Sequence, residues 1–72
     1  MEPIKPGIYR HYKGNLYEVI GVAIHSETDE EMVVYRALYG EYGLFVRPKN
    51  MFQEEVGVKG LKEPRFKLFK PF

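Results

Sequence analysis

Frequent glycines and prolines divide this chain into short segments, and this punctuation constrains the possible folds more than any other feature. Seven glycines and five prolines are spread over 72 residues. The segments between them are rich in valine, isoleucine, tyrosine and phenylalanine, and they lack the periodicity of an amphipathic helix. The sequence therefore predicts short β-strands joined by turns.

Five segments have the composition and alternation of strands. They are residues 7–12, 16–25, 32–39, 44–47 and 66–68. Gly21 lies in the middle of the second segment, where it predicts a bulge at which the inward-facing side of the strand changes. One helical turn is expected at residues 49–53, and residues 54–63 are expected to form a loop.

A strongly bent barrel suits these strands, because closure removes the exposed edges of a flat five-stranded sheet. We expect a mostly β fold, a small five-stranded SH3-like barrel with one short helical turn. Residues 1–72 would form a single domain with an ordered core of about 7–69. An OB-like barrel is the alternative, but it usually needs more chain and a helix between its third and fourth strands.

Composition limits the cellular compartment and the kinds of chemistry that can be expected of this chain. The chain contains no cysteine, which excludes disulfides and thiol catalysis and favours a reducing, cytoplasmic compartment. No apolar segment resembles a signal peptide or a membrane span, so no membrane partner is expected. The formal net charge of +1 is small for a protein held to nucleic acid by charge. Acidic residues crowd into 27–31, and basic residues into 59–70.

Several runs of residues resemble a bacterial family known as domain of unknown function 1653. They are residues 7–14 (GIYRHYKG), 25–28 (HSET), 33–39 (VVYRALY), 46–48 (VRP), 51–52 (MF) and 64–66 (PRF). Together they span most of the chain in the order and spacing of the family. The resemblance implies an SH3-type architecture and a short cytoplasmic protein. It implies no catalytic residue, because the family has no assigned activity.

His25, Ser26 and Glu27 carry the side chains of a hydrolase triad, but adjacent side chains of an extended chain point to opposite faces. We therefore expect no catalytic residue here, and turn hydrogen bonds from Ser26 and Thr28 instead. The spacing of His11 and His25 fits no known metal-ligand pattern, so neither a metal site nor a cofactor is expected. A small-molecule or metal-binding pocket around His25 remains an alternative.

Arginines stand beside aromatic or β-branched residues at four places. They are Arg10, Arg36, Arg47 and Arg65. One interpretation is structural, in which they pair across strands with Glu18, Glu27 or Glu41. The other is functional, in which guanidinium groups meet carboxylates or phosphates beside aromatic platforms. So small a barrel cannot hold every tyrosine and phenylalanine in its centre, which favours an aromatic surface of this kind.

The function expected from these observations is a non-enzymatic module that binds a peptide or protein through an arginine and aromatic surface. The candidate ligand-binding residues are Tyr9, Arg10, His11, His25, Ser26, Glu27, Tyr35, Arg36 and Arg47. Single-stranded nucleic acid is an alternative ligand, held by Arg10, Lys13, Arg36, Arg47 and the basic segment 59–70. A monomer or weak homo-oligomer is expected, and self-association through the aromatic surface is a further possibility.

Overall fold

The computed structural model describes residues 3–72, apart from the side chain of Val58. These residues form seven strands and one short helix. In chain order they are β1 (Gly7–His11), β2 (Leu16–Ile24), β3 (Glu31–Ala37), β4 (Leu44–Pro48), α1 (Lys49–Phe52), β5 (Glu55–Val58), β6 (Leu61–Pro64) and β7 (Phe66–Pro71). The mostly β class and the single helical turn are confirmed. The described helix is too short to cross a lipid bilayer.

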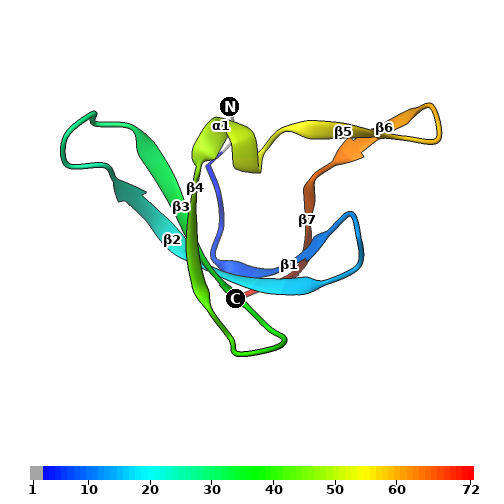
Figure 1. Cartoon of the computed structure of the whole chain (residues 1–72), viewed down its shortest axis with the longest axis horizontal. Helices are drawn as coiled ribbons and strands as arrows, with labels where there is room; N and C mark the ends of the chain where they lie inside the picture. The colour runs from blue at the N-terminus through cyan, green and yellow to red at the C-terminus, as the bar shows by residue number, and fades with distance from the viewer. Residues whose placement is uncertain (1–2) are drawn as a thin grey trace.

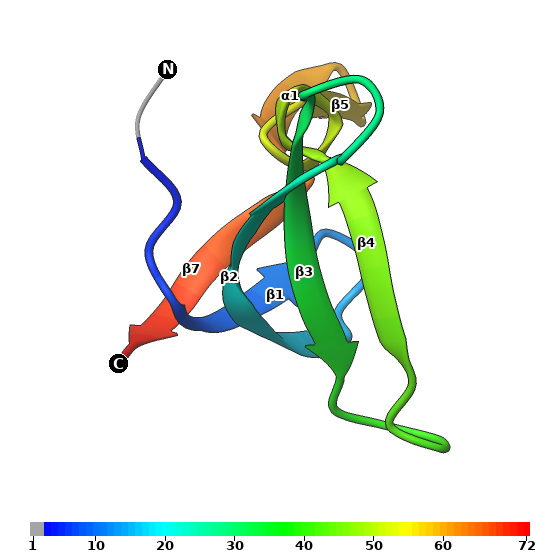
Figure 2. The same cartoon turned by 90° about the vertical axis from the view of Figure 1, so that its left-hand side faces the viewer.

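Five strands form one antiparallel sheet in the order β4-β3-β2-β1-β7. These are the five strands expected, and the last one pairs with the first as an SH3-like arrangement requires. The sheet curves around a space that the core side chains fill, with β3 and β4 on one side, β7 on the other, and α1 opposite β1 (Figure 1). Figure 2 shows the same curvature from the side of the β3–β4 hairpin.

The barrel is not closed, contrary to the expectation of a closed wall. Among the described residues, β4 pairs only with β3 and β7 pairs only with β1. Between β4 and β7 the chain makes α1 and then leaves the sheet, so the two outer strands lie on different sides of the molecule (Figures 1 and 2). The sheet therefore keeps two open edges.

The expectation of a loop at residues 54–63 is wrong. β5 and β6 form a separate hairpin in which Glu55 stands opposite Pro64 and Val58 opposite Leu61. Lys59 and Gly60 connect the strands with φ angles of 50° and 82°. Positive φ at both central residues is typical of the two-residue turns that match the twist of a hairpin. The strands are only four residues long and contain Gly57 and Pro64, which concealed them in the sequence.

The bulge expected at Gly21 is confirmed. The pairing of β2 with β3 shifts between Val19, which stands opposite Tyr35, and Gly21, which stands opposite Val34. One extra residue moves the inward side of β2 from the odd to the even positions. The strand can therefore bend around the core without presenting a continuous apolar face.

The core consists of side chains from the concave side of the sheet, covered by α1. Its buried members are Tyr9, Val19, Val33, Tyr35, Phe52 and Phe66. Phe52 is the one large side chain that α1 buries, and its ring stacks on Phe66 with centroids 4.2 Å apart. Gly7 allows β1 and β7 to approach, because a Cβ there would lie 2.7 Å from the carbonyl oxygen of Lys70.

Candidate functional site

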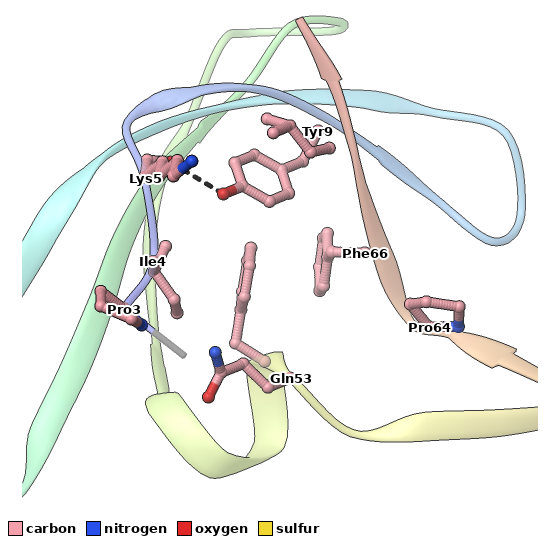
Figure 3. Close-up of a pocket in the computed structure, with 9 residues that line it drawn as sticks. Pro3, Ile4, Lys5, Tyr9, Gln53, Pro64 and Phe66 are labelled. Carbon is pink, nitrogen blue, oxygen red and sulfur yellow. Dashed lines mark hydrogen bonds between the residues drawn. The ribbon is translucent and has the colours of Figure 1, made fainter. Parts of the chain in front are cut away.

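A pocket of about 340 Å³ opens between the N-terminal segment, α1 and β7 (Figure 3). Its lining residues are Pro3, Ile4, Lys5, Tyr9, Phe52, Gln53, Pro64, Phe66 and Leu68. The Tyr9 hydroxyl donates a hydrogen bond of 2.8 Å to the carbonyl oxygen of Lys5, which ties the N-terminal segment to β1. Burial raises the pKa of Tyr9, so the phenol stays neutral.

This pocket is small, and its lining combines apolar side chains with polar groups that include Lys5 and Gln53. Its volume lies near the lower end of the range for small-molecule sites, about 300–1,000 Å³. The lining contains no histidine, carboxylate or hydroxyl other than that of Tyr9. The pocket could accept a small apolar group, but it lacks a pair of side chains able to exchange protons with a substrate.

A second aromatic region surrounds Arg47 on β4. The pairing of β3 with β4 places Arg47 opposite Val33 and Phe45 opposite Tyr35, on the concave side of the sheet. The Arg47 Nε donates to the Tyr35 hydroxyl at 3.3 Å, and the guanidinium carbon lies 5.8 Å from the centre of the Phe66 ring. We call this region the Arg47 surface. Its members are His11, Tyr17, Tyr35, Tyr39, Phe45, Arg47 and Phe66.

The charge of Arg47 is not neutralised within the described residues. Arg47 is half-buried. The ion pairs of residues 3–72 join Lys49 to Glu31 and Arg65 to Glu54, each at 3.0 Å. Neither pair includes Arg47, so its guanidinium lies among aromatic rings with no carboxylate of residues 3–72 in salt-bridge range.

Tyrosines extend this surface from Tyr35 to Tyr39. The Tyr17 ring packs against the rings of Tyr35 and Tyr39, with centroids 5.5 Å apart in both contacts. The Tyr17 and Tyr39 hydroxyl oxygens share a hydrogen bond of 2.6 Å. Burial, followed by this hydrogen bond, raises the pKa of Tyr17 to about 12. Tyr39 and Phe45 are 43% and 48% exposed, so each offers a ring to a partner.

His11 reports the electrostatic potential at this surface. Its ring lies 4.9 Å from the centre of the Phe66 ring. Burial lowers the pKa of His11, and the positive charges of Arg65, Arg47 and Lys13 lower it further. Three cations therefore act on one imidazole, and the same potential attracts an anion.

The structure brings three of the nine candidate residues together, namely His11, Tyr35 and Arg47. Tyr9 belongs to the pocket instead. Arg10 is exposed, and its guanidinium lies 5.0 Å from the centre of the Phe69 ring. Arg36 donates to the carbonyl oxygen of Tyr42 at 2.8 Å. These contacts of Arg10 and Arg36 lie outside the Arg47 surface, although Arg10 lines a small pocket together with His11.

The other three candidates, His25, Ser26 and Glu27, lie in the exposed loop after β2. This loop and the β1–β2 turn are at opposite ends of β2 (Figure 1). His25 Nδ1 accepts hydrogen bonds from the amides of Glu27 and Thr28 at 3.2 and 3.4 Å. Thr28 Oγ1 accepts one from the amide of Glu30 at 3.2 Å. The hydrogen-bonding role expected of Thr28 in the turn is confirmed. Within residues 3–72 no three side chains of metal-ligating type are grouped.

The expected pairing of arginines with Glu18, Glu27 or Glu41 is wrong for the described part of the chain. Glu18 stands opposite Arg36 in the sheet, but the Arg36 guanidinium turns to the nearby turn carbonyl. Arg65 pairs with Glu54, which precedes β5. The β5–β6 hairpin lies between these two residues in the chain, so the ion pair joins the two ends of the hairpin.

Sequence reasoning left four members of the Arg47 surface out of the candidate site: Tyr17, Tyr39, Phe45 and Phe66. The signal for Tyr17 was available, because Tyr17 and Val19 share the inward side of β2 before the bulge. Phe66 gave no local signal. It reaches the surface because it stands opposite His11 in the pairing of β7 with β1.

Comparison with known proteins agrees with this fold. The DUF1653 family, described as a protein of unknown function, matches residues 7–68. This chain belongs to that family. A crystal structure of a DUF1653 protein from Bordetella bronchiseptica is similar to it, with a TM-score of 0.87 and 38% identity over 96% of this chain and 91% of that one. No protein with a curated description matches. The resemblance noted in the sequence is confirmed.

Proposed function

We propose that this DUF1653 domain is a non-enzymatic binding module that recognises an acidic segment of a peptide or protein at the Arg47 surface. One observation carries the proposal: the Arg47 guanidinium is half-buried among aromatic rings, and no described carboxylate pairs with it. Partial burial removes water from a charge, and the loss is offset only when an opposite charge or hydrogen-bond acceptors replace that water. A ligand carboxylate would supply both, because it fits the planar guanidinium fork.

The surroundings of Arg47 support recognition of a protein. Phe45 presents an exposed ring on the same side of β4 as Arg47, and Tyr39 presents another through its contact with Tyr17. Tyrosine, phenylalanine and arginine are enriched at protein interfaces. The positive potential that lowers the pKa of His11 favours an acidic ligand. The nearest histidine does not suggest catalysis, since Nδ1 of His11 accepts a hydrogen bond from the Lys13 amide at 3.2 Å and no described serine or cysteine belongs to the surface.

Single-stranded nucleic acid is the second candidate. The convergence of Arg47, Arg65 and Lys13 on His11 favours it, because a phosphate can replace the carboxylate and bases can stack on exposed aromatic rings. The net charge of +1 weakens it, since counterion release by many cations dominates nucleic-acid affinity.

Peptide selection tests the proposal. We expect random peptides displayed on phage and selected against the domain to be enriched in aspartate and glutamate. The affinity of a selected peptide, measured by fluorescence anisotropy, should fall about 10- to 100-fold in Arg47→Gln, which corresponds to the loss of one charge-assisted hydrogen-bonded contact. Arg10→Gln is the matched control, because the Arg10 guanidinium also lies over a phenylalanine ring, but over that of Phe69 and not that of Phe66.

Two results would contradict the proposal. Selected peptides without acidic residues, or equal binding by Arg47→Gln and Arg10→Gln, would remove the role of the Arg47 surface. Labelled oligothymidylate and oligouridylate measured in the same assay test the second candidate. Binding of these oligonucleotides that is tighter than that of the peptides and weakens steeply with salt would favour nucleic acid.

A further inference from the structure

The outer strand β4 has one side without a partner in the described structure. β4 pairs only with β3. The backbone hydrogen bonds outside the sheet ladders and helices include no residue from Leu44 to Pro48. The outer edge of β4 therefore faces solvent and borders the opening between β4 and β7.

The pairing pattern shows which backbone groups are free. The Ala37 amide donates to the carbonyl oxygen of Gly43 at 2.9 Å. Bonded and non-bonded pairs alternate along an antiparallel ladder, so the next bonded pairs are Tyr35 with Phe45 and Val33 with Arg47. It follows that the amide and carbonyl groups of the two intervening residues, Leu44 and Val46, point away from β3.

Nothing on β4 blocks the addition of another strand before its last residue. Natural sheet edges are commonly protected by lysines, prolines or bulges. The pairing of β3 with β4 contains no register shift, and proline occurs only at Pro48. Leu44, Phe45 and Val46 are 54%, 48% and 59% exposed. An apolar, regular and unpaired edge of this kind can accept an extended peptide.

We propose that the partner of the Arg47 surface is an extended acidic segment that pairs with the open edge of β4 as an additional strand. This inference rests on the proposed function and specifies how the ligand is held. Arg47 and Phe45 face the concave side of the sheet, whereas Leu44 and Val46 face outward. A strand paired with β4 places its own side chains alternately on the same two sides.

This geometry defines the chemistry of the partner. Side chains directly opposite each other on neighbouring strands have Cβ atoms about 4.5–5.5 Å apart, so a glutamate on the concave side reaches Arg47. The intervening outward positions contact Leu44 and Val46, and they favour valine, isoleucine or threonine. The partner segment therefore alternates acidic and β-branched residues over about five or six positions, the usual length of a strand.

Charge complementarity favours this partner over a second copy of the chain. In an antiparallel pair of two β4 edges centred on Val46, each Arg47 would stand opposite a Phe45. Both guanidinium groups would remain without a carboxylate. A second copy is therefore one of the outcomes that the experiment must distinguish.

Synthetic peptides test the inference directly. The parent probe is a capped peptide of about six residues that alternates threonine and valine, with one glutamate at a threonine position. Its controls are the glutamine version and two versions methylated on alternate backbone nitrogens, one for each edge of the strand. We expect the glutamine peptide to bind about 10-fold more weakly. One methylated series should lose binding, because its donors to β4 are removed, and the other should bind like the parent.

Two variants of β4 complete the experiment. Val46→Pro removes the outward-facing amide without removing a hydrogen bond to β3, so peptide binding should fall at least about 10-fold. Val46→Thr keeps the amide and changes only the outward side chain, so it should lose much less binding than Val46→Pro. In the wild-type domain, the amide protons of Leu44 and Val46 should become protected from hydrogen exchange when the parent peptide binds.

The outcomes separate the two proposals. Equal binding by both methylated series, with the glutamate preference retained, overturns strand addition and leaves the proposed function standing. The proposed function, and with it the acidic partner, is overturned if the glutamate and glutamine peptides bind equally and Arg47→Gln binds like the wild type. A dimer in solution that Val46→Pro converts to a monomer assigns the edge to a second copy and also overturns the inference. The inference of strand addition is also overturned if the parent peptide does not bind at millimolar concentration.

Discussion

The pocket and the Arg47 surface share the ring of Phe66, but they differ in what surrounds it. On the pocket side, Phe66 stacks on Phe52, and Tyr9 meets Phe52 edge-on with centroids 5.6 Å apart. These three rings are between 2% and 8% exposed. On the other side, Phe66 contacts Tyr17, and Arg47 lies over its ring. One aromatic side chain therefore serves two regions with different physical roles.

This comparison shows that aromatic residues alone do not identify a binding surface. The pocket rings are neutral and buried, so their main contribution is to exclude apolar area from water and fill the core. The rings around Arg47 include two that are more than two-fifths exposed, Tyr39 and Phe45. They also surround a charge that the described residues leave without a counterion. We infer that the pocket side stabilises the fold and that the Arg47 side carries recognition.

The largest effect is expected from Phe52→Ala on the pocket side. Removing a buried phenylalanine ring costs about 3–5 kcal/mol, and a small domain often has a free energy of unfolding of only about 5 kcal/mol. The variant should therefore be largely unfolded or very easily denatured. Urea denaturation followed by circular dichroism measures the change. Met51→Ala, at a side chain 45% exposed on the same helical turn, should change stability by less than about 0.5 kcal/mol. Equal stability of the two variants would refute the structural role of the pocket side.

A smaller effect on stability is expected from Arg47→Gln. The substitution removes a long hydrogen bond to Tyr35, but it also removes a charge without a described counterion. The free energy of unfolding should therefore change by less than about 1.5 kcal/mol, although ligand affinity falls. The same denaturation series measures it. A loss of stability as large as that of Phe52→Ala would break the division between the two regions, because Arg47 would then be a structural residue.

Much of the fold could be predicted from the sequence because its signals are local. Alternation and punctuation located the five strands of the main sheet, and a single glycine inside a strand located the bulge at Gly21. The hairpin of β5 and β6 was missed because each strand has only four residues. In addition, Lys59 adopts a positive φ that residues with a side chain rarely adopt. The prediction of a closed barrel was also wrong, because no local sequence pattern indicates whether β4 and β7 pair.

The candidate site was harder to predict than the strands. Its arginines were grouped by their neighbours in the sequence, whereas membership of the Arg47 surface depends on which side of the sheet each residue faces. Arg36 and Arg47 both lie in strands, but Arg36 stands opposite Leu44 on the outer side and Arg47 opposite Val33 on the inner side. Strand register decides which side of the sheet each arginine faces, and the register cannot be read from a single sequence.

The pH dependence of His11 offers a sharper view of the charged side. Its pKa is lowered in the folded state, so the unfolded chain binds more protons just below the ordinary histidine value of about 6.5. The stability contributed by neutral His11 is therefore present above that pH and is lost as the pH falls toward the folded pKa.

In Arg47→Gln, the pKa of His11 should rise, because one of the three repelling cations is gone. NMR titration of the imidazole resonances measures this rise, and Arg10→Gln should leave the pKa of His11 unchanged. An unchanged pKa in Arg47→Gln would show that the guanidinium does not contribute to the potential at this surface.

The smallest effect concerns the hydroxyl pair beside Arg47. Tyr39→Phe removes the hydrogen bond that Tyr17 shares with Tyr39. The pKa of Tyr17, now about 12, should fall toward the ordinary tyrosine value of about 10 without reaching it, because burial is the largest cause of the shift. NMR of tyrosines labelled with ¹³C at Cζ resolves Tyr17 from the other phenols. Tyr42→Phe is the matched control, because Tyr42 is 54% exposed in the β3–β4 turn. If Tyr39→Phe leaves the pKa of Tyr17 at about 12, the hydroxyl pair does not order the rings in solution. The exposed Tyr39 would then be a mobile contributor to the Arg47 surface, whereas the buried rings of the pocket side would remain fixed by packing alone.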